Sequence, residues 1–205
     1  MSFNRIISLQ HADSDLCRIP RSQNLIRLTG QHPLNAEPNF SKLFQAGFIT
    51  PNELHYVRSH GAVPRLYWET HILDVDQGKL RLTMDDLRDK FEPINIAMAM
   101  GCDGVRRGEL NMIKKSKGFT WGPGAVSNAY WKGARLADVL RSAGYHDTGS
   151  KPRKRLFVNF EGADDPSEGK YATSIAFDHA IDPQNDVILA YEMVSCGSSA
   201  CQHTL

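Results

Sequence analysis

The spacing of apolar positions predicts two helices. Within residues 134–143, apolar side chains recur at the i, i+3, i+4 and i+7 positions that share one helix face, and Gly144 supplies a C-terminal stop. A shorter helix is predicted for residues 41–46, where it would pack Leu43 and Phe44.

A hairpin followed by a capped helix is predicted next along the chain. Residues 71–75 and 79–82 are rich in apolar and β-branched residues and flank a glycine-containing turn. Thr83 then caps a helix that runs to about Phe91, because Asp86 stands three residues later, where a capping box places its acid.

Three further segments read as strands. Residues 94–100 form an apolar run that predicts a buried strand, which delivers Cys102 at its end. Residues 155–160 and 187–191 are rich in β-branched and aromatic residues. Strands therefore outnumber helices, and the predicted fold class is mixed α+β.

The remaining segments are predicted to be irregular. Residues 1–30 are polar and weakly patterned, which indicates an extended arm. Residues 31–40 contain two prolines and two asparagines, and residues 49–64 contain Pro51, Gly61 and Pro64, so both segments are interpreted as loops.

Composition narrows the class of protein. The 205 residues are enough for one ordinary domain or two small ones, and 41% hydrophobic with 23% charged residues is typical of a globular chain. The net charge of +1 argues against a dedicated nucleic-acid binder. No apolar run approaches the roughly 20 residues of a membrane span, and no secretory signal is recognised. Four cysteines are too few for a disulfide scaffold, so a reducing, cytoplasmic location is expected.

The segment with the most residues that could bind a ligand or take part in catalysis begins at Cys102. Residues 106–117 hold five basic residues and one acid, a local charge of +4 in a nearly neutral chain. A thiolate is a strong ligand for soft metals, and neighbouring cations keep a cysteine ionised and attract oxyanions. The alternative is a buried cysteine followed by a solvated basic loop, and the spacing leaves both interpretations open.

Two weaker candidates lie elsewhere. In residues 56–61, Arg58 could hold an anion and His60 could donate to one, although an ordinary surface loop would look the same. In residues 161–165, carboxylates could accept hydrogen bonds from an amine-rich heterocycle, or form a simple polar turn.

These weak signals occur together in an ordered series of motifs. In the first half of the chain they are H-P-L-N-A-E-P (32–38), G-F-I-T-P (47–51), H-Y-V-R-S-H-G (55–61) and C-D-G-V-R-R (102–107). The second half continues with N-M-I-K-K-S-K-G-F-T-W-G (111–122), Y-W-K-G-A-R-L-A-D-V-L (130–140), N-F-E-G (159–162), K-Y-A-T-S-I (170–175) and I-L-A-Y-E-M (188–193). With these blocks the chain resembles the molybdenum-cofactor domain of the sulfite oxidase and eukaryotic nitrate reductase family. The K-K-S-K-G-F-T-W motif resembles that of nitrate reductases, especially fungal ones, more than that of animal sulfite oxidases.

The resemblance implies a molybdenum-molybdopterin cofactor and assigns residues to it. Cys102 would be the protein's sulfur ligand to the metal, beside the dithiolene of the pyranopterin. The pterin-contacting loop corresponds to Tyr56, Val57, Arg58, Ser59 and His60. A second cofactor-lining stretch corresponds to Asn35, Ala36, Glu37 and Pro38. Asp165 matches an acid that contacts the pterin, and Ser174 lies in a nearby block. The anion-binding positives correspond to Arg58, Arg107 and Lys117.

Two substitutions depart from the family's usual C-A-G-N-R-R text. Asp103 places a carboxylate beside the metal ligand, which would weaken anion attraction if it faced the pocket. Val105 removes an amide that could hydrogen-bond. Cys102 and Arg107 keep their relative spacing, so both keep their expected roles.

The resemblance also implies an organisation. It predicts a strand-rich, sulfite-oxidase-type molybdopterin-binding domain at 31–193, after the 1–30 arm, without the C-terminal β-sandwich dimerisation domain. Residues 194–205 match nothing in the family pattern and are interpreted as a frayed tail. The full-length family forms homodimers, and its heme and FAD domains are not encoded in this chain, so an electron-transfer partner is implied.

The function expected from the resemblance is oxygen-atom transfer at molybdenum on a small oxyanion, with nitrate reduction to nitrite preferred. Sulfite oxidation to sulfate is the alternative within the class. An inactive, truncated cofactor-binding remnant is a second alternative. A cysteine hydrolase that pairs Cys102 with His55 or His60 is a third, although no orienting third residue is recognised for it.

Overall fold

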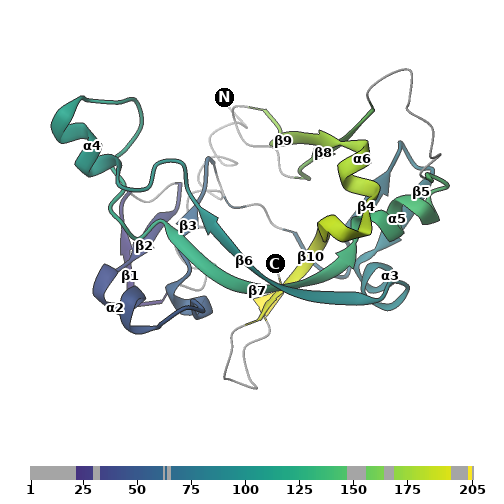
Figure 1. Cartoon of the computed structure of the whole chain (residues 1–205), viewed down its shortest axis with the longest axis horizontal. Helices are drawn as coiled ribbons and strands as arrows, with labels where there is room; N and C mark the ends of the chain where they lie inside the picture. Colours follow the sequence, from purple (N-terminus) through teal and green to yellow (C-terminus); the bar gives the residue numbers. More distant parts are fainter. Residues whose placement is uncertain are drawn as a thin grey trace, which may run out of the picture. The chain divides into compact units, whose positions relative to one another are not determined.

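The structure, a computed structural model, describes residues 22–29, 33–61, 63, 66–146, 156–163, 169–194 and 203–204 (Figure 1). Its strands are β1 (Leu25–Arg27), β2 (Asn35–Pro38), β3 (Val57–Arg58), β4 (Ile72–Val75), β5 (Leu80–Thr83), β6 (Pro93–Gly101), β7 (Val126–Arg135), β8 (Phe157–Glu161), β9 (Ala172–Ala176), β10 (Ile188–Val194) and β11 (His203–Thr204). Its helices are α2 (Phe40–Gln45), α3 (Met84–Asp89), α4 (Arg107–Ile113), α5 (Leu136–Ser142) and α6 (Phe177–Ile181), with 3-10 turns η1 (Asn52–Leu54) and η2 (Pro183–Asn185). The predicted mixed, strand-rich α+β class is confirmed.

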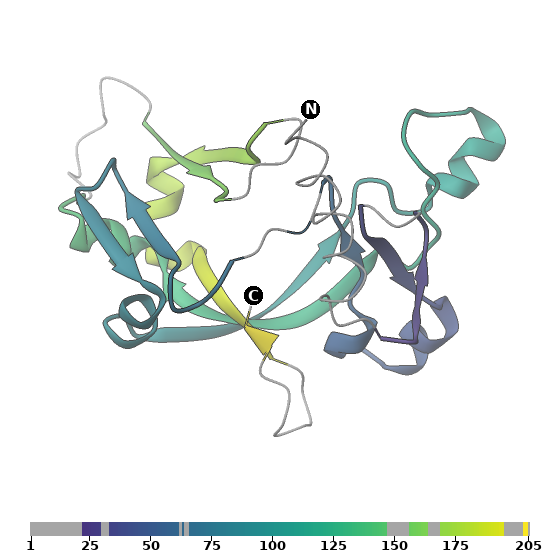
Figure 2. The same ribbon diagram turned by 180° about the vertical axis from the view of Figure 1, so that it is seen from behind.

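The chain divides into two compact units. Unit 1 contains the described residues up to 63 together with 97–130, and unit 2 contains the described residues of 66–96, 131–194 and 203–204. Strands β6 and β7 each have residues in both units, and they lie side by side in both views (Figures 1 and 2). They belong to a four-stranded sheet of order β11-β10-β7-β6.

Unit 1 is organised around a small antiparallel sheet of order β1-β2-β3. Strand β2 is its central strand and is buried along its whole length. It pairs with β1 through Ile26 opposite Glu37, and with β3 through Asn35 opposite Arg58. The sheet therefore places two segments predicted to touch the cofactor next to each other.

Unit 2 has two hydrophobic clusters of its own. The first contains Leu82, Leu87, Ala134, Val139 and Tyr191, which come from the β4–β5 hairpin, α3, α5 and the long strands. The second packs α5 against α6 and the β8–β9 hairpin. Helix α5 contributes to both clusters because its apolar positions cover more than one face of a short helix.

Helix α3 begins with the predicted capping box. The Asp86 N–H donates to Thr83 Oγ1 at 3.0 Å, and the Thr83 N–H donates to Asp86 Oδ2 at 3.0 Å. A hydrogen bond from Lys90, together with those from Thr83, lowers the pKa of Asp86 to about 2. The capping box therefore fixes the point where β5 ends and α3 begins.

Most elements predicted from periodicity are confirmed. The structure contains the short helix α2, the β4–β5 hairpin, helix α5 and strands β6, β8 and β10 close to their expected positions. Gly144 follows α5 with φ +85, the left-handed conformation that suits a helix stop. None of the helices in the described residues has the length and apolar content to cross a membrane.

Several predictions are wrong in detail, and strand pairing explains those that concern the presumed loops, the arm and the tail. The presumed loops at 31–40 and 49–64 supply β2 and β3, and the 1–30 arm supplies β1. The basic loop after Cys102 contains α4, and the tail supplies β11, which pairs with β10. The strand expected to be buried, β6, is mostly exposed because it lies at the edge of the described sheet.

Gly133 marks a close approach between β7 and β10. A Cβ atom there would overlap the carbonyl oxygen of Leu189 and stand 2.7 Å from Cα of Ala190. Both are backbone atoms, so the strands would have to move apart. We expect Gly133→Ala to lower the free energy of unfolding by about 1–3 kcal/mol through overpacking. Chemical denaturation measures the change.

Gly101→Ala, at the end of β6, is the matched control. A Cβ atom at Gly101 would meet Ala125 O at 3.8 Å, an ordinary contact. We expect that variant to unfold at nearly the same denaturant concentration as the parent chain. Equal destabilisation by the two substitutions would contradict the close approach at Gly133.

Candidate functional site

Cys102 lies directly after β6, at the start of the turn that leads into α4. Its N–H donates to Ala125 O at 3.0 Å, and its half-buried Sγ accepts the Gly104 N–H at 3.4 Å. The cysteine is not part of a disulfide. The sulfur is thereby fixed by the backbone of the turn that follows it.

Arg107 occupies a space left by two glycines. A Cβ atom at Gly104 would stand 3.3 Å from Cζ of Arg107, and a Cβ atom at Gly118 would overlap its Nη1. Gly118 also has φ +96, a conformation that L side chains rarely adopt. The Arg107 guanidinium also donates to Phe119 O at 3.3 Å. Gly104 therefore donates to the sulfur of Cys102 and, because it has no side chain, leaves room for the guanidinium of Arg107.

Arg58 is held on β3 by its own neighbours. Its Nη1 donates to Ser59 O at 2.6 Å, and its Nη2 lies 3.2 Å from Nδ1 of His60. Its guanidinium carbon lies 5.6 Å from the centre of the Phe119 ring, within the range of a cation–π contact. Arg58 and Arg107 therefore both contact Phe119, one through the ring and one through the backbone.

Three aromatic side chains connect these groups. Trp121 is 1% exposed; its ring centre lies 5.2 Å from that of Phe119 and 6.3 Å from that of Tyr56. A Cβ atom at Gly104 would stand 2.6 Å from Cδ1 of Trp121, so the indole packs directly on the turn after Cys102. Burial, with the negative charge of Cys102 in second place, raises the pKa of Tyr56. Cys102, Tyr56, Trp121 and both arginines thus belong to one cluster.

The buried carboxylate of Glu37 fixes the segment that carries Trp121. Its Oε1 accepts the Gly122 N–H at 2.8 Å, and its Oε2 accepts the Gly124 N–H at 3.2 Å. Neither glycine has space for a side chain, because a Cβ atom at Gly122 would overlap the carboxylate and one at Gly124 would stand 2.5 Å from Pro38 O. Gly122 O in turn accepts the Arg106 N–H at 2.9 Å. Glu37 therefore connects β2 to the turn around Cys102.

Asn35 performs a similar task for the other arginine. Its side chain is fully buried, with Nδ2 donating to Ser59 O at 3.1 Å and Oδ1 accepting the Ser59 N–H at 2.9 Å. Ala36 and Pro38 are buried on the same strand, and Val57 is half-buried opposite Ala36. In the structure, the stretch predicted to line the cofactor therefore supports the 57–60 segment through strand pairing and hydrogen bonds.

His55 is committed to hydrogen bonds that support the loop. Its Nε2 lies 2.7 Å from Ser127 Oγ and its Nδ1 lies 2.8 Å from Tyr56 O. Burial lowers the pKa of His55, against the opposing effect of the Tyr56 carbonyl. Both ring nitrogens have partners, so the geometry gives no support to His55 as a base for Cys102 in a hydrolase.

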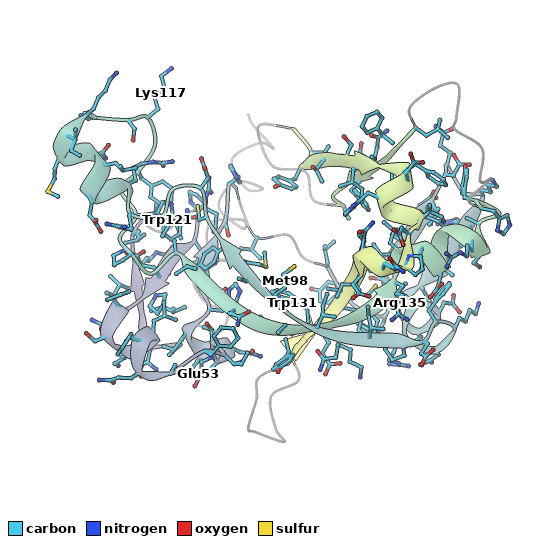
Figure 3. The ribbon with its side chains drawn as sticks, in the orientation of Figure 1. Glu53, Met98, Lys117, Trp121, Trp131 and Arg135 are labelled. Atoms are coloured by element: carbon cyan, nitrogen blue, oxygen red, sulfur yellow. The ribbon has the colours of Figure 1, made fainter. Side chains whose placement is uncertain are left out.

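The remaining predicted site residues make none of the contacts described above, and one lies outside the described residues. Lys117 is exposed and points away from the loop that follows α4 (Figure 3). Asp103 is also exposed. Ser174 lies in unit 2, exposed on β9 and paired in register with Asn159. Asp165 lies outside the described residues.

Sequence reasoning missed the contacts made by Phe119 and Trp121. Both lie in the S-K-G-F-T-W-G motif, which in the sequence indicates only the family resemblance. Two aromatic residues between glycines, close to a run of cations, were the available signal. Their meaning depends on Arg58, which lies about sixty residues earlier in the chain.

The arrangement combines a soft sulfur donor with two guanidinium groups that can bind an oxyanion. Among the described residues, no group of three or more His, Cys, Asp or Glu side chains could hold a metal ion. A metal at Cys102 would therefore take most of its ligands from a bound cofactor. A half-buried cysteine that is not part of a disulfide fits a metal complex bound through its sulfur.

Comparison with known proteins finds relatives of similar sequence and a solved structure of similar fold. Residues 60–195 match the family described as oxidoreductase molybdopterin binding domain. The chain is 49% identical over 181 residues to nitrate reductase (NADH) 1 of Oryza sativa subsp. japonica, a match covering 84% of this chain and 19% of that protein. It is 48% identical to a Hordeum vulgare nitrate reductase (NADH), a match that covers 84% of this chain and 19% of that protein. It is 42% identical to the nitrate reductase (NADH) of Ulva prolifera, a match that covers 85% of this chain and 20% of that protein. The chain thus spans about a fifth of the length of these relatives.

A solved structure supports the fold independently. The sulfane dehydrogenase SoxCD from Paracoccus pantotrophus superimposes with a TM-score of 0.55 at 20% identity, covering 88% of this chain and 45% of that chain. At this level of identity the likeness concerns the fold alone.

Glu37→Gln tests the support of the site. The substitution keeps the shape of the side chain, but its NH2 group would face one of the two glycine N–H donors and leave it without an acceptor. We expect the free energy of unfolding to fall by about 1–3 kcal/mol, measured by chemical denaturation. The same exchange at the exposed Glu53 is the control. Equal effects of the two exchanges would show that the Glu37 hydrogen bonds carry no special weight.

Proposed function

Because the chain belongs to the family of oxidoreductase molybdopterin-binding domains, we propose that it is the molybdenum-cofactor module of an enzyme that reduces nitrate to nitrite. The observation that carries the proposal is the position of Gly104. Its N–H donates to the sulfur of Cys102, and its lack of a side chain leaves room for the guanidinium of Arg107, which a Cβ atom there would approach to 3.3 Å. The proposed metal ligand and the proposed anion-binding cation are thereby both next to one residue without a side chain.

In this proposal Cys102 holds the metal of the cofactor through its thiolate, and the segment around Tyr56 to His60 lines the pterin. When bound, the cofactor supplies oxygen-atom transfer, by which nitrate loses one oxygen atom and, with two electrons and two protons, yields nitrite and water. Arg58 and Arg107 attract and orient the anion, since a guanidinium offers a planar pair of donors to two oxygens. The buried Trp121 helps to exclude water behind them.

The choice of nitrate rests on the relatives. Nitrate reductases from a cereal, a second cereal and a green alga share 42–49% of the aligned residues with this chain. The electrons would come from heme and flavin domains or from a separate redox partner, because those relatives are about five times as long as the matched segment. We assign the cofactor-binding region to 31–193, with Asp165 and Ser174 as further residues that contact or lie near the pterin and Lys117 as a third cation for the anion.

Cys102→Ser tests the metal ligand. Serine is nearly isosteric with cysteine, but its hydroxyl is a hard and rarely ionised donor, so the fold should survive while the metal loses its protein sulfur. We expect molybdenum and pterin content to fall severalfold and dye-linked nitrate reduction to be lost. Metal analysis, pterin fluorescence after extraction and a reduced-dye assay measure the three quantities.

Cys17→Ser is the control for that exchange, since residue 17 lies outside the region 31–193 to which we assign cofactor binding. It should leave molybdenum content and turnover unchanged. Full turnover by the Cys102 variant would refute the ligand assignment. A parent chain that binds molybdenum and pterin but turns over sulfite in place of nitrate would refute the proposed substrate, and one that turns over neither would be a cofactor-binding remnant.

Arg107→Lys tests the anion site. Lysine keeps the charge but loses the planar pair of donors, so orientation of the anion should suffer more than its attraction. The loss of one charge-assisted hydrogen bond costs on the order of 1.5–3 kcal/mol, which corresponds to roughly a 10- to 150-fold rise in KM for nitrate. Steady-state kinetics with a reduced dye measures it.

Arg106→Lys is the matched control, because the Arg106 side chain is exposed and paired with Glu109. Its KM should stay within about twofold of the parent value. Unchanged kinetics in the Arg107 variant would remove Arg107 from the anion site.

A further inference from the structure

Phe119 contacts both cationic side chains of the candidate site, and it does so through two different groups. Its ring lies under the guanidinium of Arg58, with 5.6 Å from the ring centre to Cζ. Its carbonyl oxygen accepts a hydrogen bond from Nη1 of Arg107 at 3.3 Å. Arg58 and Arg107, two cations from distant parts of the sequence, thus both contact Phe119.

The ring of Phe119 is itself held firmly. Trp121 lies 5.2 Å away, centre to centre and tilted by 40°, and it is 1% exposed. Before Phe119, Gly118 adopts φ +96 and leaves room for the Arg107 guanidinium. The turn at Gly118 and the packing on Trp121 therefore fix both the ring and the carbonyl of Phe119.

The contacts leave donor groups of Arg58 available for a ligand. Of its five N–H donors, one is directed to Ser59 O and one faces Nδ1 of His60. The ring of Phe119 contacts the guanidinium without using any of its donors. Within the part of the chain that the structure describes, Arg58 therefore keeps donors that can bind an oxyanion.

We infer that Phe119 is the positioning residue that orients Arg58 relative to Arg107 so that both guanidinium groups bind one small oxyanion. This deepens the proposed function, since the oxyanion is its substrate. Phe119 does not touch the reacting atoms; it acts through the two arginines. The side chain controls Arg58, whereas the backbone carbonyl, which every residue possesses, anchors Arg107.

The test compares Phe119→Leu with Phe119→Tyr in the whole chain as purified with its cofactor. Leucine fills much of the space but has no π face, and tyrosine keeps the ring. Nitrate and sulfite are titrated by calorimetry, without turnover. We expect Phe119→Leu to raise the Kd of the bound anion roughly 2- to 30-fold, the range of a cation–π contact. Phe119→Tyr should restore the parent value, and Phe44→Leu, at an exposed phenylalanine of α2, should not change it.

Double-mutant cycles separate positioning from a general structural effect. Once Arg58→Gln has removed the cation over the ring, Phe119→Leu should cause no further loss of anion affinity. In an Arg107→Lys background it should cause the full loss, because the carbonyl of residue 119 is retained. A second readout, by nuclear magnetic resonance, is the ring-current shift of the Arg58 guanidinium protons. The shift should vanish in Phe119→Leu and persist in Phe119→Tyr.

The inference is overturned by an unchanged Arg58 shift, by an unchanged Kd, by equal losses in both arginine backgrounds, or by a parent chain that binds neither anion. Loss of fold in the leucine variant would appear as a lower melting temperature with no rescue by tyrosine, and that result also counts against positioning. Failure of the proposed function is distinguishable. A parent chain that binds an anion with the expected dependence on Phe119 but does not reduce nitrate refutes the reaction and leaves the positioning role intact.

Discussion

The buried carboxylate of Glu37 connects the two segments of unit 1 from which the candidate site is built. Glu37 accepts the N–H groups of Gly122 and Gly124 and thereby connects the central strand of unit 1 to a segment 85 residues away. That segment carries Trp121, and its carbonyls accept the N–H groups of Arg106 and Gly108 in the turn that follows Cys102. A buried carboxylate is costly unless its oxygens have partners, so the two glycine N–H groups and Glu37 depend on each other.

Electrostatics in the cluster are balanced by backbone dipoles and aromatic faces more than by ion pairs. The sulfur of Cys102 accepts an N–H, Arg107 donates to a carbonyl, and Arg58 contacts a carbonyl, an imidazole and a ring. The acid beside the metal-ligand position, Asp103, is exposed. Among the described residues no carboxylate pairs with either guanidinium, and two such oriented cations attract an anionic ligand.

Small residues make this arrangement possible at several points. Gly104 and Gly118 leave the space that the Arg107 guanidinium fills, and Gly122 and Gly124 allow the approach of Glu37 and Pro38. In unit 2, Gly133 serves packing alone by letting β7 approach β10. The same residue type therefore supports binding chemistry in one unit and sheet packing in the other, and only the identity of the neighbouring atoms distinguishes the two cases.

The sequence by itself determined the elements whose signals are local. Periodicity located α5, the capping box located α3, the turn residues located the β4–β5 hairpin, and the apolar run ahead of Cys102 located the end of β6. The order of motifs indicated the family and its cofactor. Tertiary structure alone decided that Glu37 and Asn35 hold backbone groups, that Lys117 points outward and that Phe119 contacts two arginines. Those outcomes depend on partners tens of residues away, and neither periodicity nor spacing records which distant backbone group a buried side chain will meet.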